Sequence, residues 1–169
     1  MEETSYLKGR QDLLDILRKI PFFRSYEDFQ LLDILTLSKM RKYLKNEIIT
    51  KEGDYDSWLY IILAGKVDVV KNSMIVASIE GLGGTIGEMA LIDGEPRSAS
   101  VLASTDTTFL SIDMSFQDRM NDTERGRFDA VYYRLLSTIL ADRLRKTTEE
   151  LMHTKRQVKQ LMEGIPAKE

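Results

Sequence analysis

Between residues 41 and 112 the chain alternates short apolar runs with turns, and this pattern restricts the fold more than any other feature of the sequence. The turns carry glycine or asparagine, as in Gly53-Asp54 and Asn72-Ser73, which favour reversals of chain direction. Lys66-Val67-Asp68-Val69 alternates polar and apolar side chains, as a strand with one solvated face does. The pattern predicts an antiparallel, jelly-roll-like β-roll with strands over 47–50, 58–63, 66–70, 75–79, 98–102 and 107–112.

Helical patterns flank the predicted strands on both sides. The apolar spacing over 6–20 predicts an amphipathic helix that Pro21 ends, and a second short helix is predicted over 26–38. From about residue 122 the pattern is helical again. We therefore predict an α+β chain, mainly β, in three parts: an N-terminal helical segment over 1–40, a β-roll over 41–114 and C-terminal helices over 115–169, with a long helix over about 123–161.

An apolar seam with spacings of four and three runs along the long helix and indicates a heptad repeat. Its members are Leu140, Leu144, Thr147, Leu151, Thr154, Val158 and Leu161. At about 1.5 Å per residue the helix is roughly 58 Å long, more than a domain of this size can cover. We expect a homodimer in which two such helices pair in parallel; the alternative is a helix that folds back on its own domain.

Composition excludes several classes of protein. The chain of 169 residues has no cysteine and a single histidine, His153, so thiolate metal sites, cysteine nucleophiles and multi-histidine metal centres are excluded. A net charge of -3 argues against direct DNA binding. The sequence has neither a membrane-length apolar run nor a signal peptide, which favours a cytoplasmic protein without membrane contact.

The segment from Gly87 to Ala99 places a carboxylate, Glu88, and a guanidinium, Arg97, nine residues apart. The apolar stretch between them can form one helical winding and then leave as a strand, which would bring both charges to one pocket. Such a pocket suits a molecule with hydroxyl groups at one end and an anionic phosphate at the other. The alternative is a plain surface ion pair flanked by ordinary turn glycines.

Residues from about 16 to 112 resemble the cyclic nucleotide-binding domain family. The resemblance rests on Ile20-Pro21-Phe22-Phe23, on the hairpin residues 52–54 and 59–67, and on a phosphate-binding cassette over 83–99. It implies a β-roll with helices before and after it. The chain reads Leu82-Gly83-Gly84 where the family usually has a proline and an acidic residue, a change in loop stiffness more than in pocket chemistry.

The resemblance also implies roles for the cassette residues. Glu88 would accept the ribose 2′-hydroxyl, and Arg97 would hold two oxygens of the cyclic phosphate. Gly87 would let the backbone approach the sugar. The resemblance implies further contacts with the ligand from the first backbone amides of the winding, from the Ser98 hydroxyl and from the Ala99 amide. The additional site residues are therefore Met89, Ala90, Ser98 and Ala99.

Residues 141–149 resemble the dimerisation helix of the catabolite activator branch of the family. There two adjacent hydroxyl residues meet the adenine, and Thr147 and Thr148 match those positions. The alternative is that Thr147 only tunes the register of the helix pair. The threonine pair favours cyclic AMP, whereas Ser98 is compatible with either base.

We expect a regulatory module that binds cyclic AMP or cyclic GMP as its ligand, without a cofactor, and signals through the C-terminal helix to an effector protein. The alternative is a ligand-free module of the same fold that serves dimerisation or scaffolding. An enzyme is disfavoured because the sequence offers no set of nucleophile, base or metal ligands. About eight residues follow Leu161, so no helix-turn-helix domain is expected within this sequence.

Overall fold

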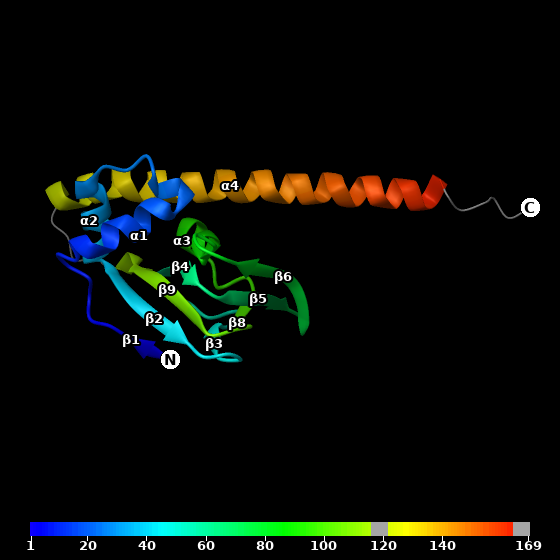
Figure 1. Cartoon of the computed structure of the whole chain (residues 1–169), viewed down its shortest axis with the longest axis horizontal. Helices are drawn as coiled ribbons and strands as arrows, with labels where there is room; N and C mark the ends of the chain where they lie inside the picture. The colour runs from blue at the N-terminus through cyan, green and yellow to red at the C-terminus, as the bar shows by residue number, and fades with distance from the viewer. Residues whose placement is uncertain (116–121, 164–169) are drawn as a thin grey trace, which may run out of the picture.

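The computed structural model describes residues 1–115 and 122–163 and confirms the predicted mainly β architecture (Figure 1). The helical elements are η1 (Gln11–Leu13), α1 (Leu14–Lys19), η2 (Pro21–Phe23), α2 (Asp28–Thr36), α3 (Glu88–Asp93) and α4 (Asp122–Glu163). The strands are β1 (Glu2–Glu3), β2 (Ser38–Tyr43), β3 (Ile48–Thr50), β4 (Trp58–Ala64), β5 (Lys66–Lys71), β6 (Met74–Glu80), β7 (Thr85–Ile86), β8 (Ser100–Ala103) and β9 (Thr107–Asp113).

The described strands form two antiparallel sheets, ordered β1-β2-β9-β4-β7 and β3-β8-β5-β6. Strand β4 shows how one sheet serves two cores, because successive side chains of a strand point to opposite faces. Ile62 packs between the sheets with Val67 and Phe109, whereas Ile61 packs against the helices. The roll therefore has one interior that belongs to the sheets and another that belongs to the helical layer.

The helical layer covers the outer face of the first sheet. Phe23 and Leu35 from the N-terminal helices and Leu135 from α4 are buried in one cluster with Leu110 of β9. Helix α2 begins with a reciprocal capping box between Glu27 and Gln30, which satisfies backbone amides at its first turn. This layer fixes the start of α4 against the roll.

The N-terminal prediction was wrong in two places. The expected helix over 6–20 is confined to 11–19, because Gly9 has a positive φ of 76° and the Leu7 amide donates to the Ser38 carbonyl instead. Strand β2 begins at Ser38, inside the stretch expected to be helical, and β1 pairs with it through Glu3 and Arg41. The charged segment Ser38–Tyr43 forms a strand although its sequence does not indicate one. Pairing with the neighbouring strands stabilises it, rather than hydrophobicity.

Helix α4 spans 42 residues and has two different environments. Its first half contributes Val131, Leu135 and Ile139 to the core, whereas Leu144 and Leu161 are 69% and 71% exposed. Figure 1 shows the second half, orange to red, extending past the roll. None of the helices in the described part of the chain combines the length and apolar character that a bilayer crossing requires.

Candidate functional site

The cassette folds as a short helix between two left-handed glycines. Gly87 precedes α3 with a φ of 95°, and Gly94 follows it with a φ of 70°. A Cβ added to Gly87 would lie 1.9 Å from Nη1 of Arg97 and 2.8 Å from the Trp58 carbonyl oxygen. Glycine is therefore required here both for its backbone conformation and because the arginine packs directly against it.

The cassette residues line one cavity of about 440 Å³, a volume that includes its open mouth. The structure brings seven of the predicted site residues to its wall: Gly87, Glu88, Met89, Ala90, Arg97, Ser98 and Ala99. Val69, Ile79 and Val101 supply an apolar wall from the second sheet. The cavity thus combines a charged floor with an apolar side, as a pocket for a polar ligand with a flat ring would.

Glu88 lines the cavity and is fully buried, at 0% exposed. Arg143 of α4 donates through Nη1 to Oε1 of Glu88 and through Nη2 to the Thr85 carbonyl oxygen at 2.7 Å. The second carboxylate oxygen, Oε2, has no hydrogen-bond partner among the described residues. One oxygen of this carboxylate therefore accepts from α4, and the other retains its capacity to accept a hydrogen bond.

Arg97 also lines the cavity and is 4% exposed. Its guanidinium donates through Nε to Oδ2 of Asp56 at 2.9 Å, and through Nη2 to Oδ1 of Asp56 and to the Trp58 carbonyl oxygen. Nη1 is buried without a partner in the described part of the chain. Buried polar groups are nearly always hydrogen-bonded, so Nη1 marks a place for an acceptor.

The two remaining predicted residues lie elsewhere. Thr147 and Thr148 are exposed on α4 and do not line the cavity within this chain. Sequence analysis missed Arg143 and Asp56, which hold the two cavity charges. A buried charge needs a counter-charge, so partners could be anticipated, but they lie 55 and 41 residues away from Glu88 and Arg97, and no local spacing identifies them.

Other chemistry receives no support from the arrangement. Within 1–115 and 122–163, no three acidic or histidine side chains come together as a metal site would require. Burial is the largest cause that raises the pKa of the Tyr60 phenol above its ordinary value, so this group beside Arg97 stays protonated at neutral pH.

Comparison with known proteins agrees with this geometry. A cGMP-dependent protein kinase of Plasmodium berghei is 37% identical over 89 residues, which cover 53% of this chain but only 10% of the kinase. A cyclic nucleotide-binding domain from Methylobacillus flagellatus superposes with a TM-score of 0.73 at 24% identity, covering 90% of this chain and 88% of that one. The regulatory subunit of a cAMP-independent protein kinase A from Trypanosoma brucei superposes with a TM-score of 0.66 at 22% identity, covering 89% and 51%.

The two solved structures share the fold, and the kinase shares sequence over about half of this chain. The cyclic nucleotide-binding domain family matches residues 40–122, a range that contains the whole cassette. Residues 40–122 of this chain therefore form a domain of the cyclic nucleotide-binding domain family.

Proposed function

We propose that the chain is a cyclic nucleotide sensor that binds cyclic AMP or cyclic GMP in the cassette cavity and signals through α4 to a partner protein. One observation carries this proposal. Two buried ions of opposite charge, Glu88 and Arg97, line the same cavity, and each keeps one polar atom without a hydrogen-bond partner in the described part of the chain. A cyclic nucleotide supplies a ribose hydroxyl for the first and a phosphate oxygen for the second.

The phosphate end suits a single negative charge. Arg97 is already neutralised in part by Asp56, so its free Nη1 and the nearby amides of the cassette suit a monoanionic phosphodiester better than a dianionic phosphate. The exposed Ser98 adds a hydroxyl at the rim of the cavity. The site therefore favours a cyclic nucleotide over a linear one.

The ribose end connects the ligand to α4. A ribose hydroxyl that donates to Oε2 of Glu88 would share the carboxylate with Arg143, which holds Oε1 and the Thr85 carbonyl. Any movement of the carboxylate on binding is thereby transmitted to α4. A helix whose position is biased by a ligand is a suitable two-state element for a signal.

The exposed half of α4 supports the proposal of a homodimer. Leu144, Leu151 and Val158 of the seam are 69%, 51% and 48% exposed in the single chain. With the seam at the a and d positions of the heptad, Glu150 and Lys155 occupy g and e positions that face each other across a parallel pair. A second copy of this helix therefore matches both the apolar seam and the charges that flank it.

A ligand-free scaffold is the second candidate, and the Asp56–Arg97 pair is the observation that favours it. This internal carboxylate occupies two nitrogens of the arginine that would bind phosphate. The trypanosomal structure is the regulatory subunit of a protein kinase A described as cAMP-independent, so the same fold occurs in a kinase that does not depend on that nucleotide. The two candidates differ in one measurable property, the affinity for cyclic nucleotides.

Titration calorimetry on the intact chain separates the two candidates. Cyclic AMP, cyclic GMP and, as a linear control, 5′-AMP are titrated under the same conditions. The sensor proposal expects saturable binding of at least one cyclic nucleotide at roughly micromolar concentrations, with 5′-AMP at least about tenfold weaker. Absence of binding at millimolar cyclic nucleotide would overturn it and support the scaffold.

A further inference from the structure

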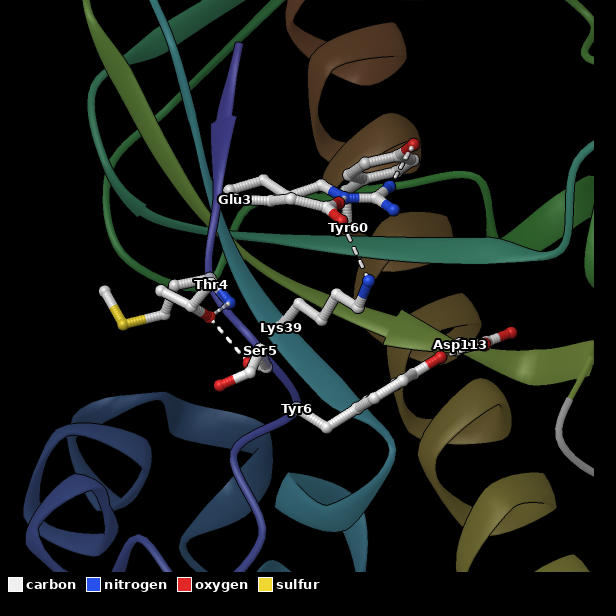
Figure 2. Close-up of polar contacts among 9 residues, drawn as sticks. Glu3, Thr4, Ser5, Tyr6, Lys39, Tyr60 and Asp113 are labelled. Carbon is white, nitrogen blue, oxygen red and sulfur yellow. Dashed lines mark hydrogen bonds and ion pairs between the residues drawn. The ribbon is translucent and has the colours of Figure 1, made fainter.

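A cluster of charged and aromatic side chains lies outside the cavity, where the N-terminal residues run along the edge of the first sheet (Figure 2). Strand β1 pairs with β2, and the Glu3 carboxylate accepts from Nζ of Lys39 at 2.8 Å and from Nε of Arg41 at 3.0 Å. Further along the same segment, the Tyr6 hydroxyl bonds Oδ2 of Asp113 at 2.5 Å. We refer to residues 2–6 as the N-terminal strap.

Arg41 is the buried member of this cluster, at 9% exposed. Its guanidinium lies 3.7 Å from the centre of the Trp58 ring, and its Nη1 donates to the Tyr60 hydroxyl at 3.2 Å. A guanidinium can stack flat on an indole and still donate in its own plane, which an ammonium cannot do. Arg41 therefore contacts two residues of β4: its guanidinium lies over the Trp58 ring, and one N–H of the same guanidinium donates to Tyr60.

Strand β4 is also where the phosphate arginine is anchored. The Trp58 carbonyl oxygen accepts from Nη2 of Arg97 at 2.5 Å, and the Arg97 guanidinium lies 5.9 Å from the centre of the Tyr60 ring. Trp58 also stands opposite Asp113, the residue that bonds the strap through Tyr6. A continuous series of contacts thus runs from Glu3 through Arg41 and Trp58 to Arg97.

We propose that the N-terminal strap and Arg41 are positioning elements for Arg97, and that they set the affinity of the phosphate end without touching the ligand. This inference rests on the proposed function, since it concerns the phosphate of the same ligand. Glu3 keeps Arg41 flat on Trp58, and Trp58 in turn presents its carbonyl to Arg97. Arg41 itself does not line the cavity, so its effect on binding must pass through β4.

The test uses two variants and a matched control. Glu3→Gln removes the carboxylate charge at a partly exposed position, and Arg41→Lys keeps the charge but loses the flat stack. Lys42→Ala on the same strand, at an exposed position, is the control. Cyclic nucleotide affinity is measured by calorimetry, folding by thermal unfolding, and the Arg41 contact by the emission of Trp58, the single tryptophan of the chain.

We expect both variants to bind cyclic nucleotide roughly 3- to 10-fold more weakly, the range that the loss of one net hydrogen bond gives. Their Trp58 emission should differ from that of the wild type, while Lys42→Ala should match the wild type in both measurements. For Glu3→Gln the unfolding temperature should fall by no more than about 4 °C, because a partly exposed ion pair contributes little to stability.

A double-mutant cycle separates positioning from a general structural role. If Glu3 acts through Arg97, adding Glu3→Gln to the Arg97→Lys variant should weaken binding by less than twofold. If Glu3 has an independent structural effect, Glu3→Gln should weaken binding by the same factor in the wild type and in Arg97→Lys. Suppose that the wild type binds cyclic nucleotide. If both variants then bind with the same affinity as the wild type, or if the two substitutions are fully additive in the cycle, this inference is overturned and the proposed function is not. Absence of binding by the wild type would overturn the proposed function, and this inference with it.

Discussion

Glu88 and Arg97, which we propose as the ribose end and the phosphate end of the site, are held by their counter-charges in different ways. Arg97 is paired within the roll, with Asp56 that lies 41 residues earlier, whereas Glu88 is paired with Arg143 of α4, 55 residues later. The proposed phosphate end is therefore built from residues of the roll alone. The ribose end depends on a helix whose second half leaves the roll, so it can report the position of that helix.

The strongest test of this contrast is Arg97→Ala at the phosphate end. The substitution removes the donor fork and leaves Asp56 without its partner, and losing one member of a buried charge pair costs about 2–5 kcal/mol. We expect affinity for cyclic nucleotide to fall by roughly 30-fold or more in calorimetry. Arg18→Ala, which removes an exposed arginine, is the control. A change of less than threefold would mean that Arg97 does not meet the phosphate.

Arg143→Ala tests the ribose end and should have a smaller effect on affinity, about 3- to 10-fold. Its larger effect should be on communication, since Arg143 is the residue that links Glu88 to α4. Hydrogen exchange of residues 140–163 is expected to change when ligand binds the wild type and to stay unchanged in the variant. An identical response of α4 in both proteins would show that the signal takes another route.

The residues at these two ends differ in whether they could be predicted from the sequence. Gly87, Glu88 and Arg97 were predicted as site residues because the cassette has a short spacing and residue types that can be read locally, and the structure places all three at one cavity. Arg143 and Asp56 were missed because each pairs across a long loop of chain, and a charged residue on a helix or in a turn has the same pattern whether it is solvated or paired. Gly87 had a second reason, contact with Arg97, that only the fold reveals.

The N-terminal strands were missed for a related reason. Ser38–Tyr43 carries three basic residues, a composition that does not indicate a strand, yet Arg41 is buried because Glu3, Trp58 and Tyr60 surround it. The roll itself was predictable, because its strands alternate and its turns carry glycine. Local pattern thus predicts elements that bury apolar side chains, and fails where an ionic neighbour from a distant segment makes burial possible.

The proposed contact between Thr148 and the base of the nucleotide gives the smallest expected effect. It also extends the contrast to a second copy of the chain. Thr148 is exposed and does not line its own cavity, so a role as a base cap needs either a shift of α4 or the helix of a partner. Thr148→Ala should weaken cyclic AMP binding by about 2- to 5-fold, less than Arg97→Ala, because one neutral hydrogen bond is lost.

Leu151→Asp distinguishes the two sources of the cap, since Leu151 is 51% exposed and its replacement should separate the proposed dimer without disturbing the core. If the partner's helix supplies the hydroxyl, this variant should be a monomer by light scattering and should lose as much cyclic AMP affinity as Thr148→Ala. A monomer that binds with wild-type affinity would place the cap on the chain's own helix. Such a result would mean that both the ribose end and the base end respond to one helix, and that dimerisation serves the output alone.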